Sequence, residues 1–146
     1  MPAPIQTSLE STLQAIRQKF ATDPQLLAMQ VANLVFAKEA PTNTDGSTAV
    51  TPPYVVINWA KGKPEWNTGG KASVLDMVNI TYYCNDDTTA YLALRKLINA
   101  FDGQSLNDQA FSAMSLMNAD VGKDTPLVWY ALIDLEITTT ESNNTN

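Results

Sequence analysis

The sequence predicts an α+β domain in which two helices pack on one face of a mainly antiparallel sheet of four to five strands. Three observations predict it. Two segments have apolar residues at helical spacing, other segments are β-branched or alternate between apolar and polar residues, and Gly- and Pro-containing stretches separate them. The predicted order is helix, three strands, helix, two strands. We expect a single domain over residues 1–138 and a disordered polar tail over residues 139–146.

The first helix is predicted to begin after Thr7. Thr7 and Glu10 match a capping box, in which each side chain bonds the backbone N–H of the other residue. The apolar residues that recur at helical spacing are Leu9, Leu13, Ile16 and Phe20. Asp23 and Pro24 interrupt this helix, and Pro24 can open a short second helix through Met29.

Three strands are predicted before the next long helix, at residues 33–38, 54–59 and 73–84. A polar loop over residues 40–53 separates the first two, and a long Gly-containing loop over residues 60–71 precedes the third. The third strand places five residues on one apolar face, namely Val74, Val78, Ile80, Tyr82 and Cys84.

The second long helix is predicted to follow Asp86 or Asp87, either of which can cap it. Gly103 is placed to end it. Its expected apolar stripe consists of Tyr91, Leu94, Ile98 and Phe101, with Leu97 beside it.

The C-terminal part is predicted to form two more strands. Residues 110–117 fit a strand or a helix, and we favour a strand because a polar turn over residues 118–125 leads into the last strand, 127–138. That strand alternates clearly, so its two faces are predictable. Facing one side are Leu127, Trp129, Ala131, Ile133, Leu135 and Ile137; facing the other are Tyr130, Asp134, Glu136 and Thr138.

The charge balance disfavours nucleic-acid and anionic-membrane binding. There are 9 basic and 15 acidic residues, for a formal charge of -6. Binding to phosphate groups needs clustered Lys and Arg, and the only arginines are Arg17 and Arg95. Only 16% of residues are charged, as expected for a chain that hides part of its surface against partners. The first residues lack a secretory signal pattern, and we expect folding in a cytoplasm.

The sequence predicts no catalytic residue, no cofactor and no metal site. It contains no histidine, which removes the usual activation of serine and cysteine nucleophiles. Cys84, the one cysteine, lies on the apolar face of a predicted strand and is expected to be buried. Gly69, Gly70 and Lys71 lack the preceding glycine and following hydroxyl residue of a phosphate-binding loop. We expect the chain not to be an enzyme.

One loop combines basic and aromatic residues, and we call residues 60–71 the lysine–tryptophan segment. It contains Trp66 together with three of the nine basic residues, Lys61, Lys63 and Lys71. One interpretation is a solvated loop, since loops are ordinarily polar. The other is a partner interface, because exposed Trp is favoured as an anchor and lysines would complement an acidic neighbour.

The order of elements resembles the tail terminator or tail completion proteins of tailed bacteriophages. The resemblance spans residues 7–138: an N-terminal helix, a Pro-rich loop into Pro53-Tyr54-Val55-Val56-Ile57, a long strand, a helix and a closing alternating strand. The lysine–tryptophan segment and the Asn-rich C-terminus do not map onto the family.

The resemblance implies a structural virion protein of the tail or neck, assembled in the host cytoplasm. Its partners would be copies of itself in a ring, typically of six, together with the tail-tube protein and the head–tail connector. DNA would pass through the channel without specific binding, and the acids expected to line it are Asp120 and Asp124. No membrane partner is implied.

Three alternatives stay open. The chain could be another head–tail connector or a tube-like subunit. It could instead be a small module that binds a ligand in a pocket under the lysine–tryptophan segment. An enzyme that uses Asp or Glu with a metal is the most distant of the three.

Overall fold

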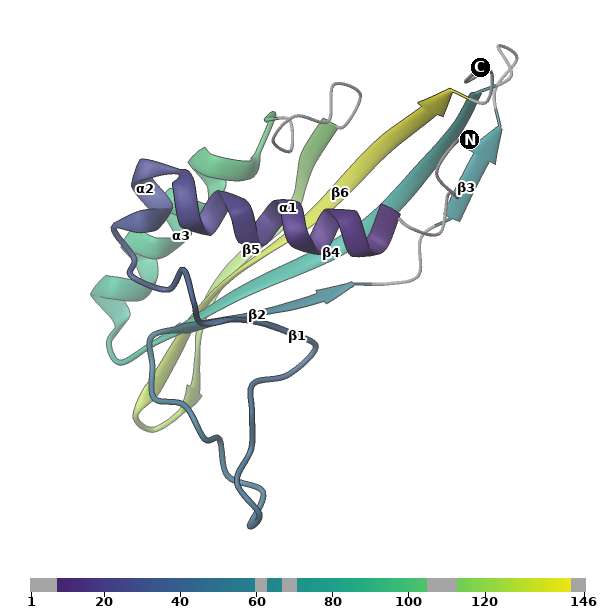
Figure 1. The fold of residues 1–146 in the computed structure, drawn as a ribbon. Helices are drawn as coiled ribbons and strands as arrows, with labels where there is room; N and C mark the ends of the chain where they lie inside the picture. The colour runs from purple at the N-terminus through teal and green to yellow at the C-terminus, as the bar shows by residue number, and fades with distance from the viewer. Residues whose placement is uncertain (1–7, 60–62, 67–70, 105–112, 143–146) are drawn as a thin grey trace.

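The structure is a computed structural model that describes residues 8–59, 63–66, 71–104 and 113–142, with the backbone alone for residues 8–11, 59, 63–66, 71–76, 113 and 138–142. Its strands form one mixed, mostly antiparallel sheet (Figure 1). In sheet order, the five strands of the main path are β1 (Val35–Ala37), β2 (Tyr54–Trp59), β4 (Lys71–Cys84), β6 (Val128–Ser142) and β5 (Ala113–Thr125). A further strand, β3 (Lys63–Trp66), pairs with β4, and only the β1–β2 pair is parallel.

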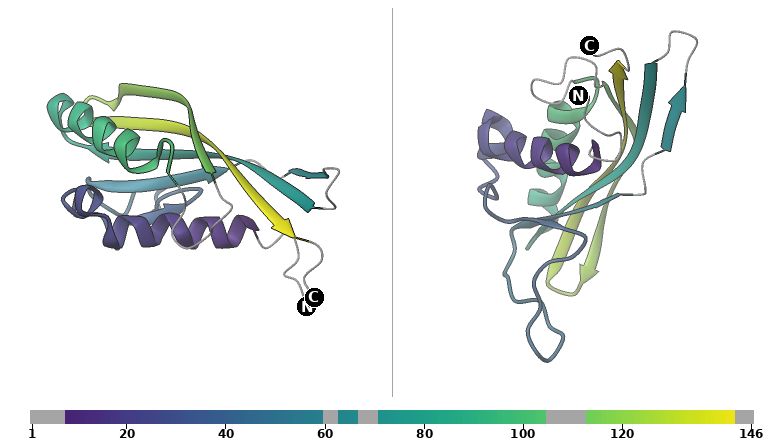
Figure 2. Two further views of the ribbon diagram at one scale, coloured as in Figure 1. Left: turned by 90° about the horizontal axis from the view of Figure 1, so that it is seen from above. Right: turned by 45° about the vertical axis from the view of Figure 1, so that its right-hand side comes forward.

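The helices pack on one face of this sheet (Figure 2). They are α1 (Ser8–Thr22), the short α2 (Pro24–Leu27) and α3 (Asp87–Phe101). The predicted α+β class, with its mainly antiparallel sheet and two covering helices, is confirmed. None of the helices in the described ranges is long and apolar enough to cross a membrane.

Aspartates cap two of the helices. Asp23 Oδ1 accepts hydrogen bonds from the N–H groups of Gln25 and Leu26, at 2.9 and 3.4 Å. Asp86 Oδ1 accepts one from the N–H of Thr89 at 2.7 Å, and this contact decides between the two predicted caps of α3. Thr7, the predicted cap of α1, lies outside the described residues. Such caps satisfy N–H groups that have no partner within the helix.

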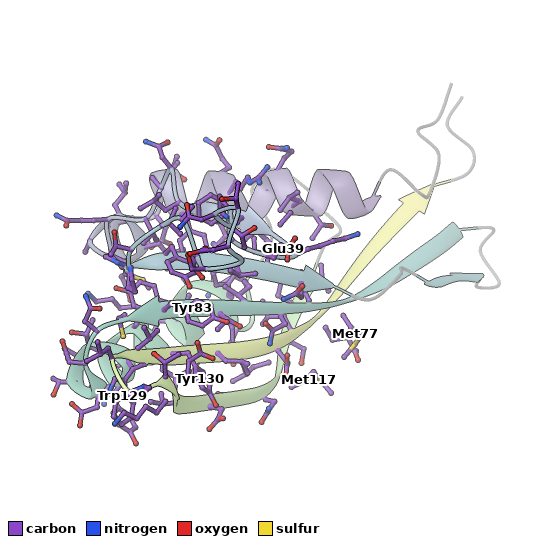
Figure 3. The ribbon with its side chains drawn as sticks, turned by 90° about the horizontal axis from the view of Figure 1, so that it is seen from below. Glu39, Met77, Tyr83, Met117, Trp129 and Tyr130 are labelled. Atoms are coloured by element: carbon purple, nitrogen blue, oxygen red, sulfur yellow. The ribbon has the colours of Figure 1, made fainter. Side chains whose placement is uncertain are left out.

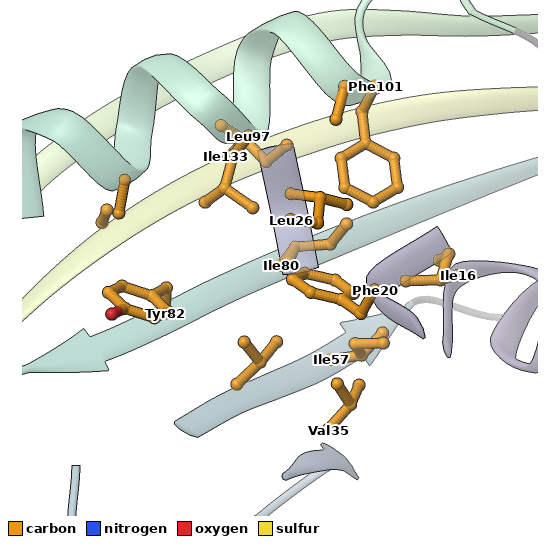
Figure 4. Close-up of a cluster of buried hydrophobic side chains, with 14 of the residues drawn as sticks. Ile16, Phe20, Leu26, Val35, Ile57, Ile80, Tyr82, Leu97, Phe101 and Ile133 are labelled. Atoms are coloured by element: carbon orange, nitrogen blue, oxygen red, sulfur yellow. The ribbon is translucent and has the colours of Figure 1, made fainter. Parts of the chain in front are cut away.

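The core lies between the helices and the sheet (Figure 4). Phe20 of α1 and Phe101 of α3 are fully buried, with ring centroids 5.9 Å apart. Below them, β4 contributes Val78, Ile80, Tyr82 and Cys84, and β6 contributes Ala131, Ile133, Leu135 and Ile137. These residues were predicted to face inward, and the prediction is confirmed for them. Each large apolar side chain buried here stabilises the fold by about 1.5–3 kcal/mol relative to exposure.

The predicted apolar stripe of α3 is wrong in part. Tyr91 is 63% exposed, and Leu94 and Ile98 are only partly buried. The residues that α3 buries are Ala90, Ala93, Leu97, Ala100 and Phe101. Three of these are alanines, whose small side chains let the helix lie close to the sheet. The buried face of α3 is therefore the one whose small residues allow close packing on the sheet. The positions of the larger apolar residues do not predict that face.

The predicted turn at residues 118–125 is also wrong, because β5 continues through all of these residues. The chain reverses instead at Pro126 and Leu127, so Leu127 lies in the turn, 80% exposed, and not in the last strand. Residues 139–142, predicted as part of a disordered tail, belong to β6, and residues 143–146 lie outside the description. The segment 60–71, predicted as a loop, contains β3 and the first residue of β4.

Candidate assembly surface

No described helix lies over the face of the sheet away from α1, α2 and α3, and we call this face the open face (Figure 3). Alternation along β2, β4, β5 and β6 sends every second side chain to it. Its exposed and partly buried members are Asn58, Met77, Asn79, Tyr83, Met117, Asn118, Asp120, Asp124, Tyr130, Leu132, Asp134 and Glu136. A loop over residues 38–53 projects beside β2 and borders this face (Figures 1 and 3).

A ladder of polar side chains crosses the open face. Asp134 of β6 accepts hydrogen bonds from amides on both flanking strands: from Asn79 Nδ2 to its Oδ1 at 2.9 Å and from Asn118 Nδ2 to its Oδ2 at 3.4 Å. The Thr81 hydroxyl donates to Asn79 Oδ1 at 2.6 Å. Hydrogen bonds to an ionised carboxylate are stronger than neutral ones. The ladder therefore fixes polar side chains across three strands of this face.

An apolar rim borders the ladder. Met77 and Met117 are 39% and 55% exposed and lie near each other at one end of the open face (Figure 3). Together with Asn58, Asn79 and Asp134 they line a shallow hollow of about 450 Å³. Met117 lies at a bulge between Leu116 and Asn118, where β5 is out of register with β6. Flexible, exposed methionines beside fixed polar groups suit a surface that contacts another protein.

Tyrosines occupy the other end of the open face. Tyr54 and Tyr83 stack with their centroids 4.9 Å apart. Burial raises the pKa of Tyr83, and the negative charge of Asp124 raises it further. The Tyr130 hydroxyl donates to Asp120 Oδ2 at 3.1 Å, and this bond raises the pKa of Tyr130. These hydroxyls stay neutral near pH 7, so they act as hydrogen-bonding groups and the aspartates supply the charge.

A second hollow, of about 290 Å³, lies beside the loop over residues 38–53. It is polar, and Lys38, Glu39 and Asp124 are among the residues that line it. The ligand pocket considered from the sequence was placed elsewhere, under the lysine–tryptophan segment. In the described ranges, no three side chains of the types His, Cys, Asp and Glu cluster in a way that could hold a metal ion.

The structure separates the predicted acids from the predicted interface residues. Asp120 and Asp124 are exposed on β5, and Asp120 pairs with Leu132 of β6. Lys63 and Trp66 lie in β3, which pairs with β4 at the opposite end of the sheet, and Lys71 begins β4. Lys61 lies outside the described residues, and the interface role of this segment stays a prediction.

Cys84 is 2% exposed, as expected for a small apolar residue in the core. Its thiol donates to the Asp86 carbonyl at 3.3 Å, and burial raises the pKa of the thiol. A reactive thiolate needs the opposite shift in pKa. The site residues that sequence reasoning missed are Asn79, Asn118 and Asp134, because only strand pairing brings them together.

No protein-family model matches the chain, and no curated protein matches it. Its fold is similar to that of a chain in the solved structure titled "Virion of native gene transfer agent (GTA) particle". The TM-score is 0.63 at 15% sequence identity, over 88% of this chain and 94% of that chain. The likeness establishes a shared fold.

Proposed function

We propose that this chain is a structural subunit of a phage-like virion, which acts through contact surfaces and catalyses no reaction. The observation that carries the proposal is the similarity of its fold, over 88% of its length, to a chain of a gene transfer agent virion. The match also covers 94% of that chain. The buried, unactivated thiol of Cys84 is consistent with a structural role.

Within the virion, the role we propose is that of a tail terminator in the neck. Copies of the chain would form a ring, typically of six, on the last ring of tail-tube protein and offer their other side to the head connector. Tube growth would stop because the far side of the ring lacks the surface to which tube subunits add. The resemblance in the order of elements, over residues 7–138, supports this finer role.

The open face is the surface that we assign to the channel. It carries four carboxylates, those of Asp120, Asp124, Asp134 and Glu136. DNA carries a dense negative charge, so an acidic wall would let it pass without adhering. Replacing Asp120 and Asp124 by lysine should give a ring that retains duplex DNA at low salt, whereas Asp120→Asn with Asp124→Asn should not.

The lysine–tryptophan segment is the interface that we assign to the neighbouring subunit or tail protein. Trp66 supplies an anchor, and Lys61, Lys63 and Lys71 supply charge complementary to an acidic neighbour. A heterologous contact of this kind joins unlike patches on successive subunits and closes into a ring.

Deletion of the gene tests the role in the particle. Loss of a tail terminator should leave heads without joined tails, alongside tail tubes of unregulated length in electron micrographs. Loss of a tube subunit would abolish the tubes, whereas loss of a head connector would leave tubes of normal length. Particles that assemble and deliver DNA normally without this chain would contradict a structural role in the virion.

A further inference from the structure

The open face carries a hollow with apolar surface, which an acidic channel wall does not require. It is the hollow of about 450 Å³ beside Met77 and Met117, and we call it the methionine hollow. A wall that only repels the phosphates of passing DNA needs negative charge and no apolar surface. Exposed apolar side chains that lie together mark sites where other molecules bind. The methionine hollow therefore calls for an occupant with apolar groups.

The bulge in β5 builds the hollow. In a regular strand, consecutive side chains point to opposite faces of the sheet. Met117 is the extra residue between Leu116 and Asn118, where β5 shifts register against β6. Because of this shift, Met117 and Asn118 both line the hollow although they are consecutive. Met77 of β4 lies near Met117 (Figure 3), so two flexible thioether side chains form the apolar part of the hollow.

Asp134 supplies a fixed negative charge at the edge of the hollow. Its two oxygens accept hydrogen bonds from Asn79 and Asn118, which are neutral amides and leave the charge in place. Each carboxylate oxygen can accept a further bond. Among the side chains that the structure describes, no Lys or Arg pairs with Asp134. Glu136, directly opposite Met77 in the sheet, adds a second carboxylate. The polar side of the hollow is therefore ready to bind a cation.

Three kinds of molecule can meet the wall of the proposed channel: another copy of the chain, DNA or another protein. In a closed ring, the same face of every subunit points to the axis, so the open faces lie across the channel from one another. DNA would bring its phosphates against Asp134 and Glu136. A protein segment that carries an apolar side chain beside lysine or arginine complements both the methionines and the carboxylates.

We propose that the methionine hollow binds a protein segment that lies in the channel. The segment presents an apolar side chain to Met77 and Met117 and a neighbouring lysine or arginine to Asp134. Flexible methionines adapt to apolar side chains of different shapes, and the charge pair fixes the orientation of the segment. The proposal rests on the ring and channel described above. Each hollow is nevertheless complete within one subunit, so its binding can be measured apart from ring formation.

Methyl resonances of labelled methionines report on the hollow directly. Met77 and Met117 line it, whereas Met29 and Met114 are 6% and 3% exposed and serve as internal controls. The signals are assigned with Met77→Leu and Met117→Leu. The probes are three synthetic helical peptides, identical except at two positions one turn apart. These positions hold leucine and arginine, leucine and glutamate, or alanine and arginine.

We expect the leucine–arginine peptide to shift the signals of Met77 and Met117 and to leave those of Met29 and Met114 in place. Its dissociation constant should be at least about tenfold lower than that of either other peptide, because each of these lacks one of the two contacts. Equal shifts with all three peptides, or none with any, would overturn the proposal. Shifts caused by duplex DNA, or by raising the concentration of the chain alone, would assign the hollow to another occupant and overturn it as well.

Asp134→Asn tests the role of the charge and keeps a polar side chain of the same size. This variant should lose the preference for arginine over glutamate and keep the preference for leucine over alanine. Glu39→Gln removes a carboxylate outside the hollow, so it should keep both preferences. An unchanged preference for arginine in Asp134→Asn would overturn the assigned charge pair. A ring whose methionines respond to no peptide would refute the binding and leave the ring intact, whereas a chain that binds the peptide but never forms a ring would refute the channel as its place.

Discussion

The ring of Tyr130 on β6 lies over Gly122 of β5, so close that a Cβ added to Gly122 would stand 2.6 Å from Tyr130 Cζ. The Tyr130 ring can occupy this position because Gly122 has no side chain. From that place the Tyr130 hydroxyl reaches Asp120, two residues before Gly122. This arrangement sets the position of a carboxylate on the surface that we assign to the channel.

We predict that Gly122→Ala displaces the Tyr130 ring and breaks its bond to Asp120. The hydrogen bond to Asp120 raises the pKa of Tyr130, so its loss should lower that pKa toward the ordinary value for tyrosine. Because the folded state holds this proton more tightly, the contact stabilises the fold below about pH 10 and is lost as the pH rises through the raised pKa. Ultraviolet titration measures the change, with Tyr130→Phe identifying the signal. Asp120→Asn should lower the same pKa without a clash, and an unchanged titration in both variants would refute the arrangement.

Phe20 is the core residue whose removal we expect to cost most. It is fully buried against Phe101, and both rings fix the helices on the sheet. Phe20→Ala should lower the free energy of unfolding by about 3–5 kcal/mol, through lost burial and the cavity left behind. Urea denaturation measures the change. Tyr91→Ala, which removes an aromatic ring 63% exposed on α3, should change it by no more than about 0.5 kcal/mol. Similar losses in the two variants would contradict the packing described.

The sequence predicts the elements whose periodicity is uninterrupted. The alternation of β6 identifies Ala131, Ile133, Leu135 and Ile137 as core residues. It is uninterrupted because β6 pairs with β4 without a register shift. In β5 the bulge at Met117 interrupts the alternation, so the pattern of apolar residues does not reveal the whole strand. Its second half also consists of residues that resemble a turn, because that stretch carries little of the core.

The candidate surface is less predictable than the fold. Asp120 and Asp124 can be selected as exposed acids from the sequence alone. The bond between Asn79 and Asp134 joins residues 55 positions apart, and nothing in the local pattern of either strand indicates it. Register decides such contacts, and register follows from the whole sheet.

Asp86 should make the stability of the chain depend on pH. Its hydrogen bonds to the backbone and side chain of Thr89 lower the pKa of its carboxyl group. A lowered pKa means that the cap stabilises the fold above the pKa of the unfolded chain and is lost as the pH falls through the pKa of the folded chain. We expect Asp86→Ala to lower the melting temperature at pH 7 by about 3 °C. Asp86→Asn should still cap α3 and should flatten the acid limb of the stability curve. An unchanged acid limb in Asp86→Asn would rule out this carboxyl as its source.

Trp66 is the residue that we expect to anchor the proposed interface. Trp66→Ala should leave the chain folded and weaken ring formation or binding of the tail partner by at least about thirtyfold, as for an interfacial anchor. Sedimentation measures the assembly. Tyr91→Ala, at an exposed aromatic residue of α3, is the control and should leave assembly unchanged. Unaltered assembly of Trp66→Ala would remove Trp66 from the interface.

Native mass spectrometry of the purified chain, alone and mixed with the tail-tube protein, tests the central claim most directly. If the chain is a structural ring subunit, the spectrum should contain one closed assembly of a fixed number of copies, typically six of the 15.9 kDa chain. That assembly should persist at the concentrations at which tail parts join. A single copy under every condition, with no complex beside the tube protein, would contradict it.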